Sequence, residues 1–118
     1  MSRGPKPRRA YRAAIPVARC RGKIQMAENG PERLYDFTIV SAIPVAFVCV
    51  KYAPRILLSL TEIAAEFHEA ILELMAVTRD TAISRELWIC SKHGTLRFFR
   101  IMENGLVELG RDGHPLAG

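Results

Sequence analysis

Two apolar runs near the middle of the chain dominate its pattern of hydrophobic and polar positions. The first is RLYDFTIV, residues 33–40, and the second is VAFVCVKY, residues 45–52. Both are rich in β-branched and aromatic residues and are apolar on both faces, which is typical of central strands that are covered on both sides. Residues 41–44 form a short connection between them, so the pattern predicts a tight hairpin inside a sheet.

A helical period follows the hairpin. In SLTEIAAEFHEAILELMAV, residues 59–77, apolar positions recur at steps of three and four, and glutamates fall on the opposite side. Ser59 and Glu62 match the capping box, in which each side chain bonds the backbone amide of the other residue. The pattern therefore predicts one amphipathic helix of about four turns.

The remaining segments predict further strands and two loose ends. ARCRGKIQMAENG, residues 18–30, predicts a strand before a turn, and residues 85–109 predict three strands separated by turns at Gly94 and Gly105. We therefore predict an α+β fold for residues 23–110, with a mixed sheet of about five strands and one main helix. Residues 1–22 predict a flexible basic tail, and residues 111–118 predict a frayed C-terminus.

Positive charge is concentrated at the start of the chain. Eight of the 17 lysines and arginines lie in residues 1–23, which hold no acidic residue, so nine basic residues face all 12 acidic residues in the remainder. The net charge of +5 therefore originates in the N-terminal segment. Such a segment is either an electrostatic arm for the phosphates of a nucleic acid, through Arg8, Arg9 and Arg12, or an arm with another role.

Apolar runs and cysteines exclude several classes of protein. The longest apolar run, residues 37–50, contains Pro44 and is too short to span a bilayer. Cys20, Cys49 and Cys90 are odd in number and far apart, so we expect neither a disulfide framework nor a paired-cysteine zinc site. We predict a protein with no membrane partner and a reducing, cytoplasmic location.

The predicted hairpin carries two charges. Asp36 stands at the head of the first run, Lys51 ends the second, and the amphipathic helix follows. This arrangement resembles the PD-(D/E)xK nuclease superfamily, more closely its small Holliday-junction-resolvase-like and archaeal members. In that family a first acid lies near a strand start, and an acid, any residue and a lysine lie on the next strand. The resemblance covers residues 32–91 and implies a restriction-endonuclease-like core.

The resemblance also implies Mg²⁺-dependent cleavage of phosphodiesters, with Asp36 and Lys51 as catalytic residues. Mg²⁺ prefers carboxylate oxygens, polarises the phosphate and lowers the pKa of an attacking water. Asp36 would hold the ion, with Glu62 as a candidate second ligand. Lys51 would stabilise the developing charge or orient the water.

Cys49 occupies the position of the second acid in this motif. A thiol is a poor ligand for Mg²⁺, because soft sulfur suits zinc or copper. A relocated carboxylate could compensate, from Glu62 or Glu66 on the helix, from Glu32 upstream, or from Glu86 on the next strand. Spacing alone does not choose among them.

Each residue of the motif also has a structural interpretation. Asp36 could cap a turn or pair with Arg33, and Lys51 could be the solvated end of a strand. Cys49 in an apolar strand is typical of a buried small hydrophobic side chain.

The segment WICSKHGTLRFFR, residues 88–100, interleaves aromatic and basic residues. Exposed aromatics beside cations can stack bases and hold phosphates, which makes Lys92, Arg97 and Arg100 candidate nucleic-acid contacts. Alternatively, the aromatic side chains belong to the core and the cations form a solvated rim, since successive side chains of a strand face opposite ways.

Three functions remain open on these patterns. The first is a nucleic-acid-binding protein, with DNA favoured over RNA, whose nuclease-like site is degenerate and inactive. The second is an active Mg²⁺-dependent endonuclease with a relocated acid. The third is a protein-interaction or homodimerisation module that uses a sheet edge or an apolar surface.

Overall fold

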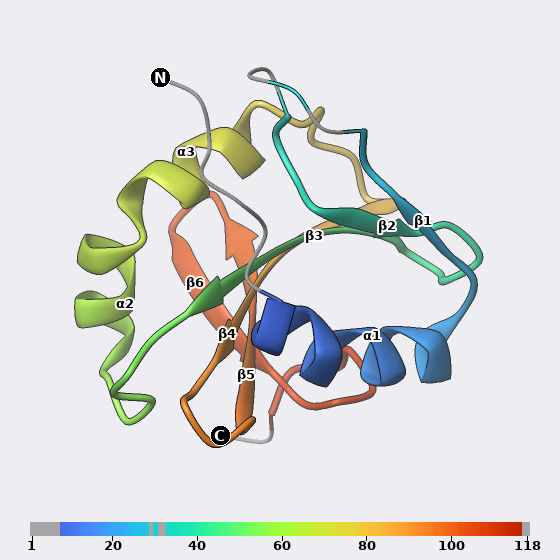
Figure 1. Cartoon of the computed structure of the whole chain (residues 1–118). Coiled ribbons are helices and arrows are strands. Elements are labelled where there is room, and N and C mark those ends of the chain that lie inside the picture. The colour runs from blue at the N-terminus through green and yellow to red at the C-terminus, as the bar shows by residue number, and fades with distance from the viewer. Residues whose placement is uncertain (1–7, 29, 31–32, 117–118) are drawn as a thin grey trace.

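The protein consists of one mixed β-sheet with helices packed on both of its faces (Figure 1). The computed structural model describes residues 8–28, 30 and 33–116. Along the chain the elements are α1 (Arg8–Arg21), β1 (Ile24–Met26), β2 (Phe37–Ile39), β3 (Val45–Tyr52), α2 (Leu60–Glu66), α3 (His68–Met75), β4 (Ile83–Cys90), β5 (Leu96–Met102) and β6 (Gly105–Leu109).

The six strands lie in the sheet in the order of the sequence, β1-β2-β3-β4-β5-β6. All neighbours are antiparallel except β3 and β4, which are parallel with Val48 opposite Glu86. A parallel pair needs a crossover connection, and α2 and α3 supply it. The predicted α+β class is confirmed, with six strands and three helices where the sequence indicated about five and one.

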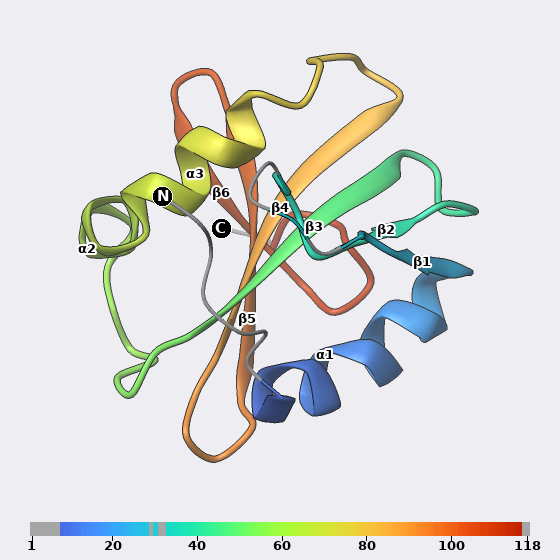
Figure 2. The same ribbon diagram turned by 45° about the horizontal axis from the view of Figure 1, so that its top comes forward.

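Helix α1 lies on one face of the sheet and α2 and α3 lie on the other (Figure 2). Each face buries a separate hydrophobic cluster. On one face, which we call the α1 face, α1 packs against side chains that include Val48, Val50 and Trp88. On the other, the helix-pair face, α2 and α3 cover side chains that include Cys49 and Leu87. Alternation along β3 and β4 therefore sends neighbouring residues to opposite layers.

The prediction of a flexible tail over residues 1–22 is wrong for residues 8–21, which form α1. Residues 1–7 lie outside the described part of the chain. The buried side of α1 consists of Ala10, Ala14, Val17 and Ala18. These positions have a helical spacing, but their side chains are small, so they give only a weak hydrophobic pattern in the sequence. The same small side chains allow the helix to pack closely against the sheet.

The predicted single helix after the hairpin is interrupted once. Ser59 and Glu62 form the capping box as predicted, with Ser59 Oγ accepting from the Glu62 amide at 3.1 Å and Glu62 Oε1 accepting from the Ser59 amide at 3.0 Å. Phe67 then leaves the helical conformation, with φ −107° and ψ 30°, and separates α2 from α3. In the described residues, no helix combines the length and the apolar character that a bilayer crossing requires.

The prediction of a frayed C-terminus is wrong for residues 111–116. Leu109 forms an isolated bridge with Pro115, and the Leu116 amide donates to the Glu108 carbonyl at 3.0 Å. Gly113, which is buried, lies in a turn between these contacts. The segment therefore folds back along β6; residues 117 and 118 are outside the described part.

Candidate functional site

Asp36 lies beside β3 at the point where β2 begins. Its amide donates to the Val48 carbonyl at 2.7 Å, and its Oδ2 accepts from the Val50 amide at 2.6 Å. These bonds go to the residues on either side of Cys49. Asp36, at the first-acid position of the motif, therefore lies next to Cys49, at the second-acid position. Lys51 is two residues beyond Cys49 and shares its face of β3. The hairpin therefore brings together the three motif positions that the sequence singled out.

The carboxylate of Asp36 is held by the protein itself. The residue is 1 % exposed, and its Oδ2 takes the place of a backbone carbonyl in the ladder between β2 and β3. Arg33 Nη2 lies 3.5 Å from Oδ1, and the Arg33 side chain is 6 % exposed. This is the predicted pairing with Arg33, and it gives Asp36 a structural role at the start of the hairpin.

The candidate replacement acids that the structure describes do not join Asp36 in a metal site. Glu62 is exposed and engaged in the capping box, where the amide and hydroxyl of Ser59 hold the pKa of its carboxyl below the usual value. Glu66 is exposed on α2. Glu32 lies outside the described residues. Within the ranges that the structure describes, no three His, Cys, Asp or Glu side chains are grouped as metal ligands.

Glu86, the fourth candidate acid, lies on the opposite face of the sheet from Cys49. It is 0 % exposed and faces α1, where Arg21 binds it through two bonds of 2.8 and 3.0 Å. Ser84 Oγ donates to Glu86 at 2.7 Å, and Trp88 Nε1 donates at 2.9 Å. The carboxylate is therefore fully engaged by four donors.

This buried network is the feature that sequence reasoning missed. Ser84, Glu86 and Trp88 alternate along β4, so their side chains share one face, and this spacing was a readable signal. Arg100 extends the network by donating to Ser84 Oγ at 2.8 Å and to the Gly113 carbonyl at 3.0 Å. Arg21 and Arg100 thus join α1, β4, β5 and the C-terminal turn.

The predicted nucleic-acid contacts divide into exposed and engaged residues. Arg8, Arg9 and Arg12 are exposed on α1, and Lys92 is exposed in the turn between β4 and β5. Arg100 is half-buried by the contacts given above.

Arg97 has a structural role instead of the predicted phosphate contact. It binds Glu108 through two bonds of 2.8 Å and donates to the carbonyls of Ile56 and Leu58. The pairing with Glu108 raises the pKa of Arg97, and the same pairing lowers the pKa of Glu108. All of its contacts are within the domain, so Arg97 is not free to bind a phosphate.

The aromatic residues near β5 belong to the core, as the structural alternative for this segment predicted, but of its expected solvated cations only Lys92 is exposed. Trp88 and Phe99 are 0 % exposed and Phe98 is 4 % exposed. Trp88 packs edge-on against Phe37 and Phe98, with ring centroids 5.6 and 4.8 Å away. None of these three rings is available for stacking on a base.

A line of basic side chains follows the solvent side of α1. Arg8, Arg12 and Arg19 are exposed and recur at steps that keep them on one side of the helix, away from Ala14 and Ala18, and Lys23, two residues beyond the end of α1, is exposed as well. We call these four residues, together with the exposed Arg9, the basic stripe. Within the described parts of the chain, none of their side chains makes a hydrogen bond or an ion pair.

The first turn of α1 contains no acidic residue, and two arginines stand there. Cations at a helix N-terminus oppose the helix dipole, so this placement costs helix stability. The charges of the first turn therefore do not stabilise α1; packing of its alanine side against the sheet and the ion pair of Arg21 with Glu86 hold it in place.

Comparison with models of known protein families, with curated protein sequences and with solved structures gave no match to this chain.

Proposed function

We propose that this protein binds nucleic acid, DNA in preference to RNA, through the basic stripe of α1. The observation that supports this proposal is a folded helix without an acidic residue that presents Arg8, Arg9, Arg12 and Arg19 to solvent, with no ion pair to any of them among the residues that the structure describes. A helix of 14 residues is about 21 Å long, so its cations can face several successive phosphates. Neutralised phosphates release counterions, which supplies affinity without sequence readout.

We further propose that the nuclease-like site at Asp36, Cys49 and Lys51 is degenerate and inactive. Cys49 adds no carboxylate, and Asp36 is committed to Arg33 and to the Val50 amide. The order of a hairpin, a helical crossover and a parallel strand agrees with the nuclease resemblance. The alternative, an active endonuclease, would require Asp36 to bind Mg²⁺.

A salt titration of binding tests the proposal. We would compare the full chain with an Arg8→Gln/Arg12→Gln/Arg19→Gln variant, using labelled duplex and branched-junction DNA. Each lost phosphate contact reduces the slope of log affinity against log salt by about 0.9, so the triple variant should lose about 2 to 3 units of slope. Arg55→Gln and Arg111→Gln, both at exposed positions outside α1, are the matched controls. An unchanged slope in the folded triple variant would overturn the proposal.

The same reactions should be run with Mg²⁺ and Mn²⁺ to score cleavage. We expect binding without cutting. Metal-dependent cutting that Lys51→Met abolishes would establish the active endonuclease instead; Lys51 is the sharper probe, because Asp36 also supports the fold.

A homodimerisation role is the second candidate. It is favoured by apolar side chains left exposed on α2 and α3, where Leu60, Leu72 and Met75 are 44, 51 and 48 % exposed. Sedimentation of the free chain at low and high salt distinguishes this role, since an apolar dimer persists in salt and ignores DNA.

A further inference from the structure

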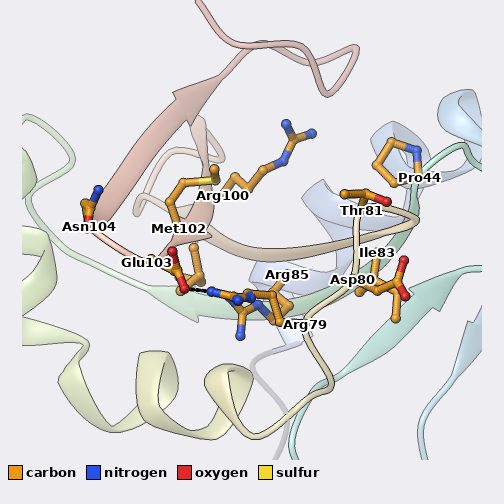
Figure 3. A pocket seen from close by; sticks show the side chains of 11 residues that line it. Pro44, Arg79, Asp80, Thr81, Ile83, Arg85, Arg100, Met102, Glu103 and Asn104 are labelled. Atoms are coloured by element: carbon orange, nitrogen blue, oxygen red, sulfur yellow. Dashed lines mark ion pairs between the residues drawn. The ribbon is translucent and has the colours of Figure 1, made fainter.

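A second basic surface lies at the end of the sheet where β3 and β4 begin and β5 ends. It is a pocket of about 690 Å³, a size typical of small-molecule sites. Three arginines line it, Arg79, Arg85 and Arg100, and Ile83, Ile101 and Met102 supply apolar walls. Figure 3 shows these side chains, which come from the start of β4, the loop before it, and the end of β5.

Arg85 is the unusual residue of this pocket. It is 7 % exposed, yet its one hydrogen bond is a long contact of 3.5 Å from Nη1 to the Met75 carbonyl at the end of α3. No acidic side chain pairs with Arg85 among the residues that the structure describes. A largely buried guanidinium is normally matched by a carboxylate or another anion.

The acids near Arg85 are engaged elsewhere. Glu103 pairs with Arg79, and both side chains are about two-thirds exposed. Asp80 Oδ1 accepts from the Ala82 amide at 2.8 Å. The pocket therefore offers a guanidinium with vacant donors beside an apolar wall, which suits a group that carries an anion and a flat apolar body.

Two further hollows adjoin this pocket and lead back to α1. One, of about 560 Å³, shares Pro44 and Arg100 with it and is also lined by Arg21. The other, of about 610 Å³, shares Ser41 with the second hollow and is lined by Arg19 and Lys23. We call the three together the basic trough. Two members of the basic stripe thus stand at its far end.

The basic trough is separate from the nuclease-like site. It surrounds the loop from Ser41 to Pro44, which joins β2 to β3. Asp36 precedes β2 and Lys51 is near the end of β3, so these two residues lie at the other end of the hairpin.

We propose that the basic trough binds a single-stranded nucleic-acid segment, with a phosphate at Arg85 and a base against the exposed side chain of Met102. This inference rests on the proposed function and names its ligand. The pocket beside Arg85 is a recess of about 690 Å³, which one base of a flexible strand can enter and the stacked, paired bases of a duplex cannot. Binding in a recess also removes the phosphate from water, which strengthens its pairing with a guanidinium.

Fluorescence anisotropy with a labelled 12-nucleotide single strand and its duplex tests this inference. The full chain should bind the single strand more tightly than the duplex. Arg85→Met keeps the apolar volume and should weaken single-strand binding by about fivefold or more, while duplex binding changes by less than twofold, since one lost charge-assisted contact is worth a factor of that order. Arg55→Gln, at the opposite end of β3, is the matched control.

A second variant tests the same pocket in case the Arg85→Met variant does not fold. Met102 is 45 % exposed, so Met102→Glu places a carboxylate in the pocket without disturbing the core. It should weaken single-strand binding selectively as well. Single-strand affinity that is unchanged in Met102→Glu would overturn the inference. So would a nucleoside monophosphate that binds as tightly as the strand, because the pocket would then belong to a free nucleotide.

These results separate the inference from the proposed function. The variant for this comparison is Arg8→Gln/Arg9→Gln/Arg12→Gln, because these three exposed members of the basic stripe do not line the trough. If it loses binding of both probes while Met102→Glu loses neither, the proposed function stands and the trough assignment fails. If it binds both probes as the full chain does, while Met102→Glu still loses the single strand, the basic stripe fails and the trough stands.

Discussion

At the scale of single residues, the buried carboxylates of this protein have structural partners. Glu86 has four donors on the α1 face, and Asp36 has Arg33 and the Val50 amide. A buried charge is tolerated when it is paired and hydrogen-bonded; Glu86 is fully bonded in this way, and Asp36 has an ion pair at Oδ1 and a hydrogen bond at Oδ2. Carboxylates committed in this way are poor candidates for metal ligands.

Substitution of Glu86 tests how strongly the network holds α1. Glu86→Gln leaves an acceptor for Trp88 but strands the Arg21 guanidinium, whose side chain is 8 % exposed. Breaking one partner of a buried pair costs about 3–5 kcal/mol, so we expect a loss of that order in the free energy of unfolding measured with urea. Glu66→Gln, an exposed change on α2, is the control. A loss below about 1 kcal/mol would mean that water reaches Arg21 readily.

At the scale of elements, the sequence predicted those whose pattern is both long and apolar. The hairpin, the capping box and the strands β4 to β6 follow from periodicity and turn residues, so they were readable. The position of α1 was not, because its buried side is made of alanines that add little hydrophobicity.

The candidate site was predictable in part. The adjacency of Asp36, Cys49 and Lys51 follows from the hairpin register, which the turn length fixes. The partner of Glu86 could not be predicted, since Arg21 is 65 residues away and meets it only after α1 docks.

The pair of Arg97 and Glu108 joins β5, β6 and the connection after β3, and it should make stability depend on pH. Because the pKa of Glu108 is lowered in the folded state, the pair contributes stability above the unfolded pKa, about 4.3 for glutamate, and loses it as pH falls further. We expect wild type to be more stable than Glu108→Gln at pH 7, and the difference to shrink at pH 3. Urea unfolding of both proteins at the two pH values measures it; a difference that is constant with pH would contradict the pairing.

At the scale of the whole molecule, one helix has both a structural side and a cationic side. The buried side of α1 closes one face of the sheet, and its exposed side carries the arginines of the basic stripe. The proposed nucleic-acid binding would therefore depend on the same 14 residues that the fold requires. If removal of the N-terminal segment abolished binding, the cause could be unfolding as well as lost phosphate contacts. Substitutions on the exposed side of α1 keep the fold and therefore test the phosphate contacts alone.

Deletion of residues 1–22 should demonstrate this coupling. It removes the cover from Val48, Val50 and Trp88 and leaves Glu86 without Arg21, so the remaining chain should lose cooperative unfolding. Trp88 is the single tryptophan, and its fluorescence reports on this face directly. We expect red-shifted emission in the deletion variant and native emission in the Arg8→Gln/Arg12→Gln/Arg19→Gln variant, which keeps the buried side of α1. Native emission with cooperative unfolding in the deletion variant would show instead that the sheet is stable without α1, and the N-terminal segment would then be a detachable arm.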